Sequence, residues 1–204
     1  MSEILGYGED ALTLWALKHR ISEILHQLDD PTQPTDCRIF YRPSFGRHSR
    51  GINAVFGEFD AIITSSRNVY LIESKWDNLA KAKDGEIKLR KEQMLRHQIF
   101  TWYLTHWNES YFGKWAEFAE KQRHSFKFER KTIAHPKRLL AKNLEFVLNA
   151  MLKHCKAVAI DNIKNVLLFF YKETKPSIKT DETFTLVQID YGTDALDSFI
   201  PLFP

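Results

Sequence analysis

The chain has 204 residues, of which 44% are hydrophobic and 27% are charged. These proportions are ordinary for a globular domain and argue against a disordered or fibrous chain. The longest strongly apolar run, residues 166–171, is too short to span a bilayer, so we expect no membrane association. The N-terminal residues lack the pattern of a secretory signal and the only cysteines are Cys37 and Cys155, so we expect a cytoplasmic protein without a disulfide framework.

The N-terminal half is expected to begin with an amphipathic helix over residues 9–28, which ends before two prolines. A first strand follows over residues 37–41, and a Pro- and Gly-containing loop follows over residues 42–51. Two apolar runs over residues 57–63 and 69–75, separated by a short Ser- and Asn-containing turn, predict a β-hairpin.

The rest of the chain is expected to be helical before it returns to strands. Helical periodicity predicts helices over residues 86–107, 112–122 and 137–155. Strands are predicted over residues 165–171 and 184–191, and a short final helix or turn over residues 193–199. This order predicts one α/β domain. Residues 1–107 and 156–204 would form its core, and residues from about 108 to 155 a helical insertion.

The hairpin carries the most informative side chains of the chain. With Ser66 and Arg67 as its loop, Asp60 falls directly opposite Glu73, and cross-strand partners have Cβ atoms roughly 4.5–5.5 Å apart. Two carboxylates at that separation repel each other unless a proton or a cation lies between them. Lys75 follows Glu73 by two residues and is therefore expected on the same face. Two carboxylates and a lysine at a strand end are suited to a hard divalent cation and an activated water.

These residues resemble the PD-(D/E)XK nuclease superfamily, in which an Asp on one strand and a Glu-x-Lys on the next bind Mg²⁺. Asp60, Glu73 and Lys75 match that pattern, and the run 57–60 resembles the Gly-Glu-Ile-Asp of some members, although Phe59 replaces the proline that names the motif. The order of elements matches the restriction endonuclease-like fold that the resemblance implies, in which a mixed central sheet is flanked by helices. The resemblance also implies a Mg²⁺-dependent endonuclease, hydrolysing DNA in repair or restriction. Mn²⁺ would be expected to substitute for Mg²⁺.

The resemblance also assigns secondary roles. A Glu on the first helix reaches the metal site in many members, which favours Glu9 over Glu23. Gln93 lies 20 residues after Glu73, where members often carry a Gln that orients the water, and neighbouring Gln98 competes for that role. Each of these residues could equally be an ordinary surface or helix-terminal side chain.

Two further residues beside the motif are candidates. Glu58 shares a strand face with Asp60 and is an additional candidate metal ligand, or simply a charge near the strand end. Trp76 follows Lys75 and could stack on a base, although core packing is the ordinary role of tryptophan.

Basic residues are unevenly distributed along a chain whose net charge is only +3. The loop before the hairpin holds candidate nucleic-acid contacts at Arg42, Arg47, His48 and Arg50, with no acid between residues 38 and 57. Residues 113–142 contain nine Lys and Arg against three Glu. Positive charge beside a carboxylate cluster suits a polyanion held around a metal site, although a solvated helix face is the simple alternative.

Other interpretations remain open at this stage. A catalytically silent nucleic-acid-binding module of the same fold, an RNA or structure-specific nuclease, and a metal hydrolase acting on another substrate fit parts of the pattern. DNA is favoured over RNA as the partner. A homodimer is possible, because one domain that cuts both strands of a duplex would need a second copy.

Overall fold

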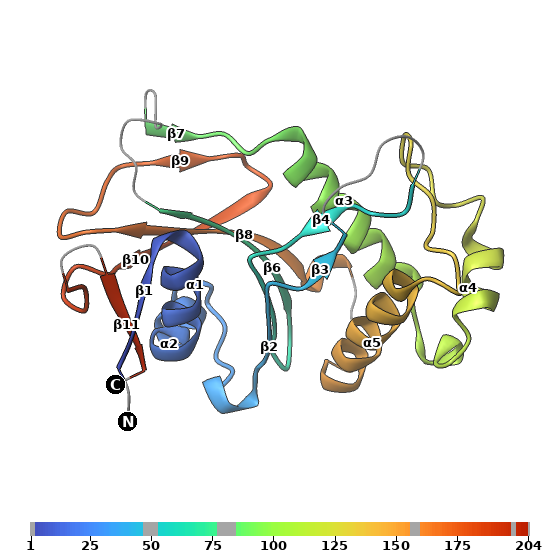
Figure 1. The fold of residues 1–204 in the computed structure, drawn as a ribbon, viewed down its shortest axis with the longest axis horizontal. Helices are drawn as coiled ribbons and strands as arrows, with labels where there is room; N and C mark the ends of the chain where they lie inside the picture. The colour runs from blue at the N-terminus through green and yellow to red at the C-terminus, as the bar shows by residue number, and fades with distance from the viewer. Residues whose placement is uncertain (1–2, 47–52, 77–84, 156–159, 197–198, 204) are drawn as a thin grey trace.

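The computed structural model describes residues 3–46, 53–76, 85–155, 160–196 and 199–203. A five-stranded mixed sheet lies at its centre, in the order β10-β8-β6-β5-β2 (Figure 1). Strands β6, β8 and β10 run parallel to one another, whereas β5 is antiparallel to both β6 and β2. The bounds of these strands are Arg38–Tyr41 for β2, Ala61–Thr64 for β5, Val69–Trp76 for β6, Ile163–Tyr171 for β8 and Phe184–Asp190 for β10.

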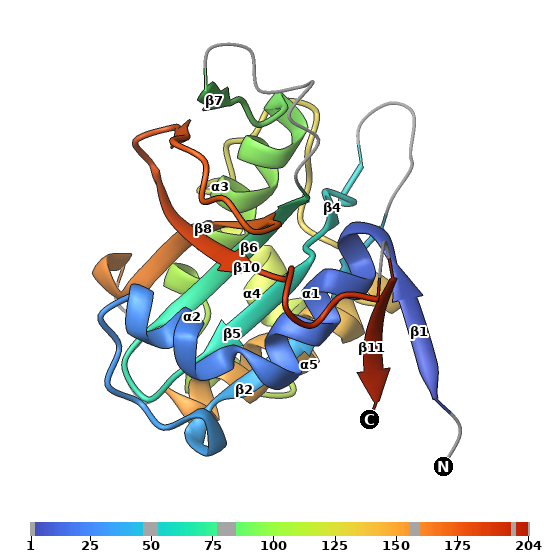
Figure 2. The same cartoon turned by 90° about the vertical axis from the view of Figure 1, so that its left-hand side faces the viewer.

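Helices cover both faces of this sheet (Figure 2). On one face, α1 (Gly8–His19) and α2 (Ile21–Gln27) pack against alternate residues of β5, β6, β8 and β10, such as Ile63 and Ile72. On the other face, α3 (Lys91–His106), α4 (Trp115–Gln122) and α5 (Leu139–His154) share a core with Ile62 and Leu71. The expected α/β fold with a mixed central sheet between helices is therefore confirmed.

Shorter elements complete the fold. Among the described residues, two-stranded sheets pair β1 (Ile4–Tyr7) with β11 (Phe199–Phe203), β3 (Ser44–Phe45) with β4 (Gly57–Glu58), and β7 (Glu86–Ile87) with β9 (Lys179–Thr180). Single 3₁₀ turns lie at Pro34–Asp36, Glu109–Tyr111 and Ile160–Asn162. No helix in the described ranges is both long enough and apolar enough to cross a membrane.

Several expected boundaries are wrong. The first helix is interrupted at Arg20, whose φ of −122° and ψ of 15° are not helical and whose guanidinium pairs with Asp194 at 3.2 Å. The helix expected from residue 86 begins at residue 91, because Glu86–Ile87 pairs with β9 instead. The helix or turn expected over residues 193–199 is a turn at its start, and β11 begins at its last residue, Phe199. β11 is an edge strand in which Pro201 is tolerated because no central ladder needs its missing N–H.

The segment 108–155 shares its hydrophobic core with the rest of the protein. Trp115 and Phe118 of α4 belong to the same buried cluster as Phe100 and Tyr103 of α3, and the Tyr103 and Trp115 rings lie 5.8 Å apart. Leu148 of α5 is fully buried in that cluster as well. The α4–α5 region is therefore continuous in packing with the helix that covers the central sheet.

The turn of the hairpin is held by Asp30, which follows α2. This carboxylate is almost fully buried, and its Oδ2 accepts hydrogen bonds from the Tyr70 hydroxyl at 2.6 Å and the Ser65 hydroxyl at 2.7 Å. The Asn68 amide donates to the same atom at 3.1 Å. Burial alone would raise the pKa of Asp30, but the bonds from Thr32, Tyr70 and Ser65 outweigh it and hold that pKa below its usual range.

Replacing Asp30 should therefore weaken the fold. We expect Asp30→Ala to lower the free energy of unfolding at pH 7 by about 2–4 kcal/mol, because several buried donors lose their acceptor. Because folding lowers the pKa of Asp30, its carboxylate stabilises the fold fully above the unfolded-state pKa near 4. This stabilisation is lost as the pH falls below that value. Urea unfolding of wild type and variant from pH 3 to pH 7 should show the two stabilities converging at the acid end.

The matched control for this prediction is Asp29→Asn, the exposed neighbouring acid. Asp29 has a positive φ of 53°, a conformation that Asn also tolerates. An equal loss of stability in both variants, or no loss in Asp30→Ala, would contradict the anchoring role of Asp30.

Candidate active site

The hairpin has the register expected from the sequence. Ala61 pairs with Ile72 and Thr64 with Val69, so the ladder ends immediately before Asp60 and Glu73. Asp60 itself lies at a bend between β4 and β5, so the single strand expected over residues 57–63 is divided in two. The bend turns the Asp60 carboxylate toward β6, where its Oδ2 accepts a hydrogen bond from the Ser74 backbone N–H at 2.7 Å.

Asp60 is a carboxylate in an unfavourable electrostatic position. Burial raises its pKa to about 6, and the charge of nearby Glu73 adds to that increase. The Ser74 N–H and the charge of Lys75 act in the opposite direction but do not compensate. Ionised Asp60 would therefore be stabilised by a cation placed between the two carboxylates.

The charge of Glu73, in contrast, is compensated by the protein. This residue is buried more completely than Asp60, with only 1% of its surface exposed. Three side chains of α3 bind it. Gln93 donates to Oε2 at 2.8 Å, His97 Nε2 lies 3.1 Å from Oε1, and Arg96 forms an ion pair with Oε1. Burial alone would raise the pKa of Glu73, but the bond from His97 and the charge of Arg96 outweigh it, so that pKa is lowered.

The structure thus places Gln93 beside Glu73, where we expected it from the sequence. It adds His97, whose spacing in the sequence puts it on the same helix face as Gln93, and Arg96, which the sequence reasoning missed. Residues 93, 96 and 97 lie on one face of α3 because helix neighbours are three or four positions apart. His97 is oriented from behind by Asn165 of β8, whose Oδ1 is 2.7 Å from Nδ1. The helical spacing after Gln93 was the available signal for Arg96.

Arg96 reaches Glu73 because residue 57 has no side chain. Gly57 has φ +117°, and a Cβ placed there would lie 2.9 Å from Arg96 Nη1. The glycine therefore provides both an uncommon backbone conformation and the space for the guanidinium.

Lys75 and Glu9 meet at the end of β6. Lys75 Nζ is 3.3 Å from Glu9 Oε1, and the Trp76 backbone N–H donates to Glu9 Oε2 at 3.2 Å. Glu9 is held at the start of α1, where the Thr13 hydroxyl bonds both to the Glu9 backbone oxygen and to the Ser74 hydroxyl. The charges of both Lys75 and Glu9 act on Asp60, so four candidate residues from the sequence lie around one point.

The remaining candidates are placed differently. Glu58 Oε1 accepts from Arg42 at 2.6 Å, and Arg42 also pairs with Asp10, so Arg42 and Glu58 are engaged with each other. Trp76 donates its indole N–H to the Tyr191 hydroxyl at 2.8 Å and packs edge-on against Tyr7, so a core contact accounts for this ring. Arg47, His48 and Arg50 lie outside the described residues.

The site offers two carboxylates, the kind of ligand that a magnesium ion prefers. Within the described ranges, no group of three or more His, Cys, Asp or Glu side chains is arranged to hold a metal. Mg²⁺, however, is usually bound through one or two carboxylates and retains several waters. Asp60 supplies an uncompensated carboxylate, and Glu73 Oε2 has a lone pair beyond the one used by Gln93.

Comparisons of the chain with protein-family models, with curated proteins and with solved structures found no match.

The raised pKa of Asp60 leads to a stability prediction. A group whose folded pKa is raised favours the fold below its unfolded pKa near 4 and loses that contribution as the pH rises through about 6. Asp60→Asn keeps an acceptor for Ser74 and removes the charge, so it should stabilise the protein by about 1–3 kcal/mol at pH 8. The gain should vanish below pH 4. Thermal unfolding from pH 4 to pH 8 measures this gain in stability, with Asp161→Asn, at an exposed position, as the control. If Asp60→Asn were less stable than wild type at pH 8, the charge of Asp60 would not be unfavourable in the fold.

A second prediction concerns Gly57. Gly57→Ala should destabilise the protein by about 2 kcal/mol or more, because the added methyl strains the backbone and displaces the Arg96 guanidinium from Glu73. Gly113→Ala is the control, since Gly113 has φ +72° but a Cβ added there would meet no atom within 4 Å, so backbone strain acts without a collision. Chemical unfolding of both variants should show the larger loss for Gly57→Ala; equal losses would mean that Arg96 is not displaced.

Proposed function

We propose that the protein is a metal-dependent nuclease that hydrolyses phosphodiester bonds of DNA, with a restriction endonuclease-like core. The observation that carries the proposal is the opposition of partly buried Asp60, at the bend before β5, and buried Glu73 of β6, with Lys75 two residues further along β6. Burial and the charge of Glu73 raise the pKa of Asp60 to about 6, which favours a cation at this point.

The chain's own residues have separate tasks in this proposal. Asp60 and Glu73 would hold Mg²⁺, and Gln93, Arg96 and His97 fix the position of the Glu73 carboxylate. When bound, the metal lowers the pKa of a water and neutralises charge on the phosphate. Lys75 would position the attacking water or a phosphate oxygen, because its ammonium is a compact point charge. Glu9 holds that ammonium at the end of β6.

A hollow of about 610 Å³ beside the site supports a polyanionic substrate. Gln93 and Arg96 line it on the side of the carboxylates, and Arg42, Arg90 and Lys131 line the rest. Its cations outnumber its two acids, Glu58 and Glu92. A groove of net positive charge that opens beside two carboxylates is suited to a phosphate backbone whose scissile bond must reach a metal.

Cleavage assays test the proposal. Wild-type protein with Mg²⁺ or Mn²⁺ should cut a DNA substrate, EDTA should stop the reaction, and Lys75→Ala should reduce the rate by at least about 10²-fold without unfolding the protein. Lys164→Ala is the matched control, because this exposed lysine lies on the neighbouring strand β8 beside Tyr70, far along the strand from Lys75. The substrates to compare are linear duplex, supercoiled plasmid, single-stranded DNA, a four-way junction and RNA.

The outcomes separate the alternatives. Cutting by Lys75→Ala at the wild-type rate would refute the assignment of the site. Salt-sensitive binding without cutting by any metal would favour a catalytically silent binding module. A preference for RNA or for the junction would retain the chemistry and change the substrate.

A further inference from the structure

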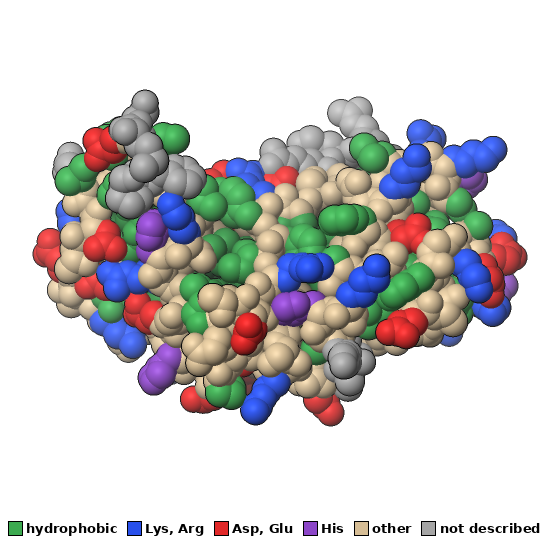
Figure 3. All heavy atoms as spheres, turned by 90° about the horizontal axis from the view of Figure 1, so that it is seen from below, with side chains coloured by type: hydrophobic (Ala, Val, Ile, Leu, Met, Phe, Trp, Pro, Cys, Tyr) green, Lys and Arg blue, Asp and Glu red, His purple; other side chains and the backbone are tan. Residues whose placement is uncertain are grey.

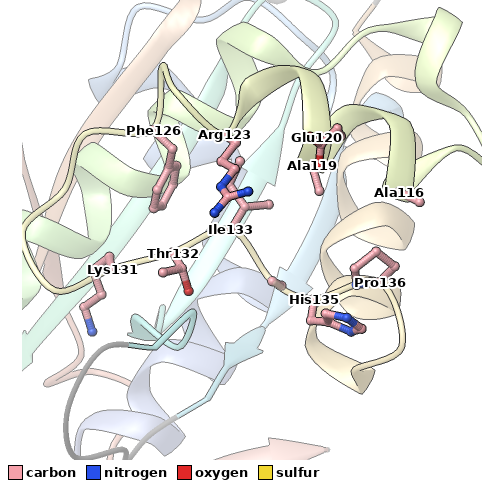
Figure 4. A pocket seen from close by; sticks show the side chains of 11 residues that line it. Ala116, Ala119, Glu120, Arg123, Phe126, Lys131, Thr132, Ile133, His135 and Pro136 are labelled. Carbon is pink, nitrogen blue, oxygen red and sulfur yellow. The ribbon is translucent and has the colours of Figure 1, made fainter.

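A second hollow lies away from the candidate active site, between α4 and the segment of residues 126–136 that leads to α5. It has a volume of about 700 Å³ and is lined by cationic and apolar side chains and by one acid, Glu120 (Figure 4). The end of the molecule where α4 lies carries many Lys and Arg side chains, with acidic side chains among them (Figure 3). The volume is within the range of small-molecule and cofactor sites.

The polar groups of this hollow are three donors, Arg123, Thr132 and His135, together with Lys131 and one carboxylate, Glu120. The Arg123 side chain forms no ion pair or hydrogen bond with the described part of the chain, and it extends across the hollow in Figure 4. His135 Nδ1 accepts a hydrogen bond from the Lys137 backbone N–H at 3.3 Å, so its Nε2 carries the proton of the neutral ring and can donate. The exposed Thr132 hydroxyl lies on the same wall. A planar guanidinium with neighbouring donors suits a phosphate group.

The remaining walls are apolar. Ala116 and Ala119 of α4 face Ile133 and Pro136 across the hollow, and the Phe126 ring lies at one end (Figure 4). A site for inorganic phosphate alone would have no need for these surfaces. One phosphate-binding side and one apolar side together match a nucleotide, which carries an anionic group and a flat, largely apolar base.

Lys131 connects this hollow with the one beside the active site, because it lines both. Its ammonium is fixed at the junction by the Val55 backbone oxygen, which accepts its hydrogen bond at 2.6 Å. From Lys131 the hollow beside the active site continues to Arg96 and Gln93, which bind Glu73. A strand held at Asp60 and Glu73 therefore has a cationic path that ends at Arg123.

We propose that the hollow between α4 and residues 126–136 binds one unpaired nucleotide of the strand that is cleaved at Asp60 and Glu73. This inference rests on the proposed nuclease function and specifies its substrate: DNA that has a single-stranded segment next to the cleavage position. A base in a duplex is stacked and paired, so only an unpaired base can turn its apolar faces into a concave pocket. Arg123 would bind the phosphate of that nucleotide, with the Nε2–H of His135 beside it.

The test measures binding in EDTA, where no cleavage occurs, by the fluorescence anisotropy of three labelled DNAs. These are a blunt duplex, the same duplex with a single-stranded overhang of five nucleotides, and the single strand. Arg123→Ala should weaken binding of the overhang and single-strand DNAs by about 5–20-fold. For these DNAs, the plot of log association constant against log salt concentration should become less steep by about 1. Binding of the blunt duplex should change by less than about twofold. Lys121→Ala is the control, because it removes one positive charge from the same helix but is paired with Glu117 at 2.9 Å and does not line the hollow.

Failure of this inference is distinguishable from failure of the nuclease function. If Arg123→Ala binds all three DNAs like wild type, or weakens all three equally, the nucleotide pocket is refuted while Lys75-dependent cleavage can stand. A deoxynucleoside monophosphate that binds in an Arg123-dependent manner, with no effect of Arg123 on any DNA, would identify a free nucleotide as the ligand and overturn the assignment to a strand. Preference for the overhang that disappears in Arg123→Ala, together with cleavage lost only in Lys75→Ala, would support both.

Discussion

The charges of two neighbouring carboxylates, Asp60 and Glu73, are compensated to different degrees, and the rest of the site depends on this difference. Glu73 is fully buried, but Arg96, His97 and Gln93 satisfy its oxygens and keep it ionised. Asp60 lies opposite and has one backbone N–H, from Ser74, and the charge of Lys75 to offset its burial. A buried charge without compensation is costly. The same fold therefore provides one fixed anion and, next to it, one anion whose charge is incompletely balanced.

This asymmetry requires support from both faces of the sheet. On one face, three side chains of α3 bind Glu73. One of them, Arg96, can reach Glu73 because Gly57 has no side chain to block it. On the other face, α1 brings Glu9 to the end of β6, where it contacts Lys75 and the Trp76 backbone. Asp30 fixes the turn of the hairpin and thereby its register. A slip of one residue would place Asp60 and Glu73 on opposite faces, so this distant turn is part of the geometry of the site.

Sequence reasoning found the elements that depend on local pattern and missed those that depend on distant partners. The opposition of Asp60 and Glu73 could be predicted, because strand alternation and the short turn determine the register. The bend at Asp60, the break at Arg20 and the pairing of β1 with β11 could not, because each depends on residues far away in the chain. Arg96 illustrates the same limit: its helical position was visible, but its contact with Glu73 depends on the missing side chain of Gly57.

The basic residues show why charge in a sequence is a weak guide to a binding surface. The sequence favours the arginine loop before the hairpin as the phosphate contact, and Arg42 is the candidate of that loop that lies within the described residues. Its charge is neutralised by Glu58 and Asp10. Arg123, an ordinary residue at an exposed helix end, has no such partner within the described ranges and faces a hollow with apolar walls. Between them, Lys131 lines both hollows and is fixed by a backbone oxygen. A cation contributes to anion binding when its charge is not already balanced by the protein. On the proposed substrate path Arg96 is paired with Glu73, whereas Lys131 and Arg123 have no carboxylate partner within the described ranges, so the unbalanced positive charge lies toward α4.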